Sequence, residues 1–151
     1  MNAIPWRDTM NLVEKILAPR HEAHAHCDLF CGTYDPAQAA IEADSCLKIV
    51  KKYHDSDDDV FRTRAIFIKE QSAELVKQHL WVLWTDFFEP KHVEQFPGLH
   101  DLFWRATKAA GAAKKTMDVA AQQEMIDLVG EVSEVFWATE KAKGAGVYPP
   151  A

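Results

Sequence analysis

The sequence predicts an all-α fold in which four helices form an antiparallel bundle. Four segments carry apolar residues at steps of three and four, and this spacing gathers them on one face of a helix. No segment shows the period-two alternation of a half-buried strand, and no Asn-Gly hairpin signal occurs. The connections between the four segments are short, which favours antiparallel neighbours.

The first predicted helix covers residues 36–54 and has a well-marked start. Asp35 can accept a hydrogen bond from the first turn, Pro36 suits the first helical position, and Gln38 stands near the place of a capping-box glutamine. The apolar stripe of this segment includes Cys46. We therefore expect the Cys46 thiol in the core of the bundle.

The other three predicted helices follow in order. One runs over 58–88 behind an acidic turn, and Pro90 ends it because proline cannot continue a helix. The next covers 99–115, after a loop. The last covers 119–143, and Asp118 can cap its first turn.

Composition indicates a single domain without a nucleic-acid partner. The chain has 151 residues, of which 48% are hydrophobic, so it can bury a sizeable core. Its formal net charge of -6 and the lack of a long lysine or arginine run argue against nucleic acid. The first 25 residues contain no continuous apolar stretch, so we expect neither a secretory signal nor a membrane span.

Residues 26–34 predict a metal hook at the N-terminal side of the bundle. An imidazole, His26, and two thiols, Cys27 and Cys31, fall within six residues just before a helix start. The three cysteines of the chain are an odd number, and these two are too close together for the framework of a small secreted domain. We therefore expect reduced thiols and a cytoplasmic location.

A cleavage signal lies directly before the hook. Ala23-His24-Ala25 is a small-x-small sequence of the kind that processing peptidases cut after. Cleavage there would make His26 the first residue of the mature protein and would free its α-amine. We therefore divide the chain into a leader, 1–25, that is removed on maturation and a four-helix domain with its hook, 26–151.

Cleavage would also complete a set of donor atoms for a metal ion. The α-amine of His26, the backbone nitrogen and thiolate of Cys27, and the thiolate of Cys31 can lie in one plane, which leaves the His26 imidazole for an axial position. Tetragonal sites of this kind suit nickel(II) or copper(II), whereas zinc prefers four side-chain ligands in a tetrahedron. Anionic sulfur and a deprotonated amide also stabilise a trivalent metal, so the donor set indicates one-electron redox chemistry.

The hook resembles the N-terminal segment of the nickel-containing superoxide dismutases. The shared pattern is His-Cys-Asp-Leu-x-Cys-Gly-x-Tyr-Asp-Pro-Ala-Gln-Ala, which is residues 26–39 here. The similarity extends over most of the chain after residue 25. The further matching runs are Ile41-Glu42-Ala43, Arg64-Ala65, Ile68-Lys69-Glu70-Gln71 and Val82-Leu83-Trp84.

This resemblance implies an enzyme with a defined cofactor and assembly. It implies a compact four-helix subunit in a homohexamer, with one nickel ion per subunit. The implied activity is the disproportionation of superoxide to oxygen and hydrogen peroxide, in which nickel alternates between its divalent and trivalent states. It also implies that a dedicated peptidase removes the leader.

The resemblance assigns roles to individual residues. It makes His26, Cys27 and Cys31 the metal ligands. Asp28 and Tyr34 match residues that shape and line the hook, with Tyr34 near the open axial face where superoxide would approach. Glu42 matches the carboxylate that orients the axial imidazole.

Three positions depart from the family pattern. Phe30 stands where the family commonly has a proline, and Ser72 stands where it has an arginine that supports the contact between the glutamate and the imidazole. Phe87 replaces a second tyrosine. We therefore expect the axial ligand to be less well tuned here.

Other functions remain open from the residues alone. A nickel or copper carrier would use the same hook without turnover, and a helical interaction protein would leave the thiols idle. The spacing of Asp55, Asp57 and Asp59 starts like a calcium loop but lacks the later glycine and glutamate. The one Glu-x-x-His pair of a di-iron type, Glu89 with His92, contains a helix-breaking proline. We expect His92 at the surface or in a loop.

Overall fold

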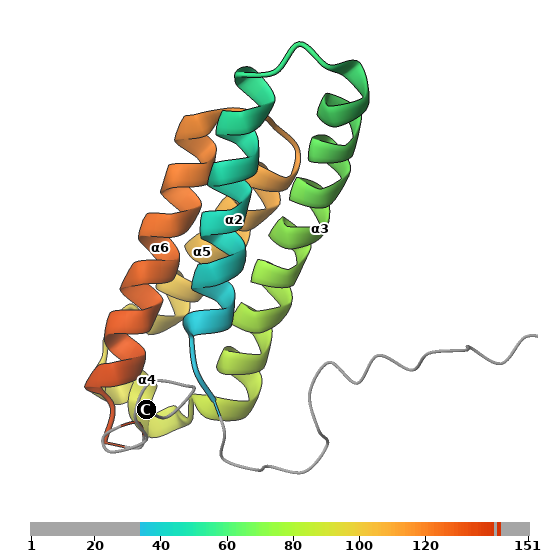
Figure 1. Cartoon of the computed structure of the whole chain (residues 1–151). Coiled ribbons are helices and arrows are strands. Elements are labelled where there is room, and N and C mark those ends of the chain that lie inside the picture. The colour runs from blue at the N-terminus through green and yellow to red at the C-terminus, as the bar shows by residue number, and fades with distance from the viewer. Residues whose placement is uncertain (1–33, 141, 143–151) are drawn as a thin grey trace, which may run out of the picture.

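The computed structural model describes residues 34–140 and residue 142, and this part of the chain is helical without strands. The all-α prediction is confirmed. Figure 1 shows the long helices side by side, and α2 packs on α3 and α6 while α5 packs on the same two helices. The elements are α2 (Ala37–His54), α3 (Asp59–Val82), η1 (Leu83–Phe87), α4 (Pro90–Gln95), α5 (Leu99–Lys114) and α6 (Val119–Ala138).

Aspartates cap the starts of α2, α3 and α6, and Asp35 and Asp118 were predicted to do so. Asp35 accepts a hydrogen bond from the backbone N–H of Ala37 at the start of α2, with 2.7 Å between the two atoms. Asp58 accepts from Val60 N at 2.9 Å, and Asp118 accepts from Ala120 N at 3.0 Å. Each carboxylate pairs a backbone donor that has no partner within its helix.

The second predicted helix contains a change of geometry at its C-terminal end. A continuous α-helix was expected over 58–88, but a π-helical turn, η1, follows α3. The N–H of Phe88 donates to the carbonyl of Leu83 at 3.0 Å, five residues back. Because the turn holds an extra residue, both Phe87 and Phe88 are buried. Such turns are frequent at functional sites.

A short helix occupies part of the connection that was predicted as a loop. This helix, α4, starts at Pro90, which is suited to a first helical position because it lacks an N–H. Figure 1 places α4 at the end of the bundle where α2 begins and α3 ends. The connection thus brings additional side chains to the end of the bundle that carries Tyr34.

The fourth predicted helix ends earlier than expected. The prediction of a helix to residue 143 is wrong, because α6 stops at Ala138. Thr139 has extended backbone angles, and its hydroxyl donates to the carbonyl of Phe136 at 2.8 Å. The N–H of Ala142 then donates to the carbonyl of Thr139 at 3.2 Å. The threonine side chain therefore competes with continued helix at this point.

A buried polar contact joins α3 to the end of α5. Lys69 is only 2% exposed, and its ammonium donates to the carbonyls of Ala113, at 3.1 Å, and Lys114. Gln122, which is fully buried on α6, donates to the same Ala113 carbonyl at 3.1 Å. The C-terminal carbonyls of α5 are thereby paired inside the bundle, where a cation is favoured by the helix dipole.

Candidate metal centre

The residues predicted to form the metal centre fall partly outside the described chain. His26, Cys27, Asp28 and Cys31 lie outside it, whereas Tyr34 and Glu42 lie within it. Among residues 34–140 and 142, no group of three or more histidine, cysteine, aspartate or glutamate side chains could hold a metal ion. The ligands of the centre therefore stay a prediction from residues 26–34, which the described part of the chain does not test.

Tyr34 packs against the end of the bundle just before α2 begins. Its ring is half-buried and meets the Phe87 ring edge to face, with 5.9 Å between the ring centroids and 62° between the planes. Phe87 is 3% exposed and closes the π-helical turn η1. Edge-to-face pairs of this kind are favourable and directional. The π-helical turn thus sets the surface on which Tyr34 rests.

His92 is a buried neighbour of Phe87 that the sequence did not reveal. The prediction that His92 lies at the surface or in a loop is wrong, because it is 2% exposed on α4. Its Nδ1 accepts a hydrogen bond from the backbone N–H of Glu89 at 3.0 Å, so the proton of the neutral ring is on Nε2. The signal that could have found it is Pro90 with a polar residue two positions later, a pattern typical of a helix start.

Ring contacts connect these side chains into an aromatic cluster formed by Tyr34, Phe87, Phe88, His92 and Phe136. His92 stacks on Phe87, with 5.9 Å between the ring centroids and 9° between the planes. Phe136 of α6 packs on Phe87 at 4.2 Å, and Phe88 meets His92 edge to face at 5.7 Å. The aromatic cluster therefore ties Tyr34 to η1, α4 and α6.

The cysteine of the bundle core is not suited to bind a metal. Cys46 is fully buried on α2, as predicted, and its Sγ donates to the carbonyl of Lys69 at 3.5 Å. Burial raises the pKa of Cys46 to about 12, against the smaller opposing effect of the Lys69 charge. A cysteine binds a metal ion as its thiolate, and this buried site disfavours the thiolate. Of the three cysteines in the chain, Cys27 and Cys31 are left as thiolate donors.

Glu42 lies on α2 one turn before Cys46, and it is half-buried. Its negative charge helps to raise the pKa of the Cys46 thiol. Ser72, which stands where the family has an arginine, is 8% exposed on α3. A hydroxyl there carries no positive charge, unlike the arginine that the resemblance implies at this position.

Lysines on the bundle differ in their access to a superoxide anion. Lys69 cannot attract an anion by direct contact because its ammonium is buried against the carbonyls that end α5. Lys51 and Lys52 are exposed in the last turn of α2, at the opposite end of this helix from Tyr34. None of these three lysines therefore lies at the surface beside Tyr34.

The raised pKa of Cys46 predicts a specific loss of stability in alkali. The thiol stays neutral in the folded protein up to a pKa of about 12 but ionises near 9.0 when unfolded. Between these values the folded state binds more protons, so the free energy of unfolding falls as pH rises. The loss is about 1.4 kcal/mol at pH 10.

A comparison of the wild type with Cys46→Ser isolates this effect from all other titrating groups. Urea unfolding at pH 7, 9, 10 and 11 should show the stability difference moving in favour of the serine variant only above pH 9. A difference that does not change with pH would contradict the buried neutral thiol.

No helix of the described chain is both long and apolar enough to cross a membrane. The described helices instead carry charged residues on their outer faces.

Comparisons with known proteins define the class of this small helical protein. The family model described as nickel-containing superoxide dismutase matches residues 21–140. A superoxide dismutase [Ni] of Streptomyces seoulensis is 48% identical over 131 residues, which are 87% of this chain and 100% of that protein. The superoxide dismutase [Ni] of Streptomyces coelicolor is 47% identical over the same shares of the two chains.

Solved structures of such enzymes share the fold. A crystal structure of Ni-containing superoxide dismutase after partial X-ray-induced reduction superposes with a TM-score of 0.74 at 51% identity, over 78% of this chain and 100% of that one. A native nickel superoxide dismutase structure at 1.30 Å gives a TM-score of 0.72 at 49% identity, over 74% of this chain and 97% of that one.

The chain belongs to the nickel-containing superoxide dismutase family. It is accordingly an oxidoreductase that acts on superoxide with nickel as its cofactor. Membership of this family favours the enzyme over the alternative of a carrier without turnover.

Proposed function

We propose that the active enzyme begins at His26, after removal of the leader 1–25, and that it dismutes superoxide at a nickel ion held by His26, Cys27 and Cys31. The observation that carries this assignment is the position of the cysteines. Cys46 is buried as a neutral thiol, which leaves the two hook cysteines as thiolate donors in the segment that precedes Tyr34.

The chemistry of these donors suits nickel. A free amine, a backbone nitrogen and two thiolates form the nitrogen- and sulfur-rich tetragonal set that divalent nickel accepts. The imidazole of His26 would complete the set. When bound, nickel supplies a one-electron couple between its divalent and trivalent states, which allows one superoxide to be oxidised to oxygen and another to be reduced to peroxide.

Tyr34 is the described residue with the strongest support for a part in the reaction. Three residues of chain span at most about 11 Å, so Cys31 is tethered close to Tyr34. The aromatic cluster fixes the Tyr34 ring through its contact with Phe87. We assign its hydroxyl to donate a hydrogen bond to the approaching anion, with Asp28 shaping the hook nearby.

Glu42 is assigned to orient the imidazole of His26. We propose that its carboxylate accepts a hydrogen bond from the imidazole of His26, which would fix the ring's position and tautomer. Half-burial on α2 supports this role, because a carboxylate with limited access to water holds a hydrogen bond more strongly.

The finer properties of the enzyme are also proposals. We propose that six copies of the subunit associate, that a dedicated peptidase removes the leader, and that the protein acts in the cytoplasm. The reduced thiols that the donor set requires support the cytoplasmic location.

Removal of the Tyr34 hydroxyl should slow the enzyme without unfolding it. The variant Tyr34→Phe keeps the ring contact with Phe87, so we expect its thermal unfolding and nickel content to match the wild type. Loss of one hydrogen bond to a charged group should lower kcat/KM for superoxide by about 10-fold or more. Superoxide decay after pulse radiolysis measures this, and unchanged kinetics would exclude the hydroxyl from the reaction.

The proposed function is tested by expressing the full chain with its own peptidase in a nickel-replete host. Intact mass should begin at His26, metal analysis should find about one nickel per chain, as the donor set holds one ion, and superoxide decay should be catalysed. Nickel bound stoichiometrically by the uncleaved chain would refute the role of the amine. Protein that is cleaved and loaded with nickel but does not catalyse superoxide decay would refute the proposed activity.

A further inference from the structure

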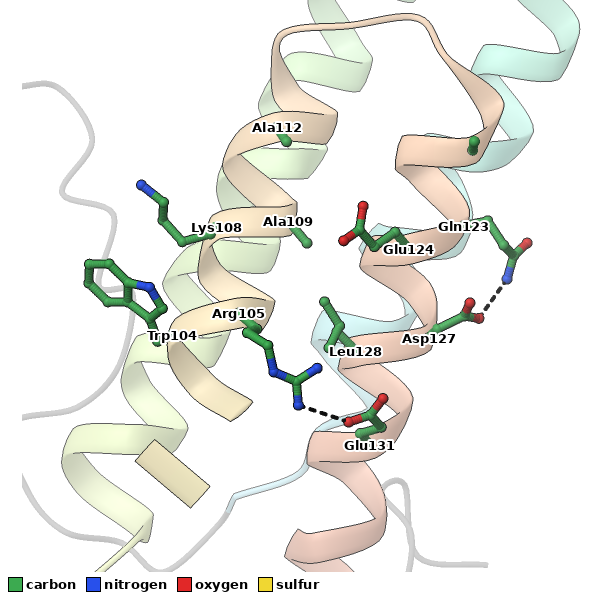
Figure 2. Close-up of a pocket in the computed structure, with 11 residues that line it drawn as sticks. Trp104, Arg105, Lys108, Ala109, Ala112, Gln123, Glu124, Asp127, Leu128 and Glu131 are labelled. Atoms are coloured by element: carbon green, nitrogen blue, oxygen red, sulfur yellow. Dashed lines mark hydrogen bonds and ion pairs between the residues drawn. The ribbon is translucent and has the colours of Figure 1, made fainter. Parts of the chain in front are cut away.

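A groove runs between α5 and α6 on the outside of the bundle. Its volume is about 910 Å³, and Figure 2 shows it open between the two helices. Small and apolar side chains lie along it, among them Ala109, Ala112 and Leu128. None of the predicted site residues lines it. Small residues let another helix approach closely, so the groove is suited to a protein surface.

The two walls of the groove carry opposite charges. Arg105 and Lys108 lie on the α5 side, whereas Glu124, Asp127 and Glu131 lie on the α6 side. Arg105 reaches across to Glu131, with 3.4 Å between the nitrogen and oxygen atoms. These two side chains remain 49% and 51% exposed. The charges therefore stay accessible to a second molecule.

An exposed tryptophan borders the basic wall. Trp104 of α5 is 61% exposed, and the ammonium of Lys108 lies 5.4 Å from its ring centroid. Tryptophan is enriched at protein interfaces, where its large ring contributes contact area. Trp104 thus adds an apolar anchor to a surface that is otherwise defined by its charges.

We propose that this groove is a contact between two copies of the chain, related by a two-fold axis that runs parallel to the helices. Such an axis places α5 of each copy on α6 of the other, so that each basic wall meets an acidic wall. Rotation about this axis does not change the position of a residue along the length of the bundle. Because Arg105 and Glu131 already share a level within one copy, Arg105 of one copy faces Glu131 of the other.

The pairing continues along the groove. Lys108 lies about one helical turn beyond Arg105, and Asp127 lies about one turn before Glu131 on the antiparallel helix α6. The second cation therefore meets the next carboxylate at its own level. This contact deepens the proposed assembly of six subunits, because it names one of the surfaces by which they associate.

Charge-swap variants of the full chain test the contact. The first variant combines Arg105→Glu with Lys108→Glu, and the second combines Asp127→Lys with Glu131→Lys. Each alone sets like charges against each other, so we expect at least about a 100-fold weaker association by analytical ultracentrifugation. An equimolar mixture restores opposite charges at both halves of the contact, and native mass spectrometry should show mixed oligomers.

A matched control separates this effect from net charge. Lys51→Glu with Lys52→Glu makes the same change in net charge as the first variant at the exposed end of α2, and it should associate as the wild type does. Circular dichroism establishes that every variant is folded.

Association that is unchanged in both charge-swap variants, or a mixture that does not reassociate, would overturn the contact while leaving the assembly of six intact. A wild type that is monomeric at micromolar concentration would overturn the assembly itself. A small cation or a basic peptide that occupied the groove would leave the wild type monomeric, so that result also counts against the contact. The nickel content and activity of each variant are measured separately, so a failure of the proposed reaction is distinguishable from both results.

Discussion

Replacing Cys27 or Cys31 with serine is expected to abolish superoxide dismutation. A hydroxyl at neutral pH is not deprotonated and does not donate to nickel as a thiolate does, so the proposed donor set loses an anionic sulfur. Changes to the partners of a metal ligand commonly cost 10–100-fold, and loss of a ligand itself should cost more than about 100-fold. Nickel content by mass spectrometry and superoxide decay by pulse radiolysis measure the loss directly.

The chain contains its own matched control for this prediction. Cys46→Ser makes the same chemical change in the core, where the new hydroxyl can take over the contact of Sγ with the Lys69 carbonyl. We expect this variant to bind nickel and to turn over superoxide at the wild-type rate. A fall in activity of Cys46→Ser equal to that of the hook variants would show that the hook cysteines have no special role.

Replacing Lys69 with alanine is expected to destabilise the described bundle strongly. The long side chain is 2% exposed, and its ammonium pairs the carbonyls of Ala113 and Lys114 at the end of α5. Truncation leaves a cavity and removes these bonds, although Gln122 still donates to Ala113. We expect urea unfolding to report a loss of about 3 kcal/mol, similar to that of truncating a buried methionine.

Lys69→Met is the companion variant that separates volume from charge. It keeps most of the buried stem and removes an ammonium whose pKa burial already lowers. The charged form costs stability below that lowered pKa, and this cost is relieved as pH rises toward 10.5. We therefore expect methionine to recover at least half of the loss. Equal losses in the two variants would mean that the hydrogen bonds dominate.

Local signals in the sequence were sufficient to place the long helices. Asp58 and Asp118 stand before apolar periodic segments, and both cap helices in the structure. The predicted burial of Cys46 is also confirmed. That prediction rested on helical periodicity alone. These features depend on residues within one turn of each other, which is the range over which sequence patterns are informative.

Features that depend on contacts between distant segments were not predictable in the same way. Lys69 matched a family run in the sequence, but nothing local showed that its ammonium reaches carbonyls more than forty positions away. The stacking of His92 on Phe87 likewise requires the π-helical turn and α4 together. A histidine and a lysine are predicted to lie at the surface as long as their tertiary partners are unknown, because most such residues are exposed.

For the metal centre, the ligands could be proposed from local sequence, whereas their surroundings could not. The proposed ligands, His26, Cys27 and Cys31, are close together in the chain, so spacing and chemistry alone suggested them. The aromatic cluster around Tyr34 became visible only in three dimensions, because three separate elements, η1, α4 and α6, contribute to it. The sequence was therefore sufficient to propose the donors, whereas the surroundings of Tyr34 required the fold.

The π-helical turn at Leu83–Phe87 makes the length of this segment as important as its composition. The turn is closed by the hydrogen bond from Phe88 to Leu83, five residues back, so it holds one residue more than an α-helical turn. Deletion of one residue would allow the segment to return to α-helical geometry, and one residue fewer would then be present to fill the end of the bundle where Phe87 and Phe88 are buried. The ring on which both Tyr34 and His92 pack is therefore set by the number of residues in this turn as well as by their identity.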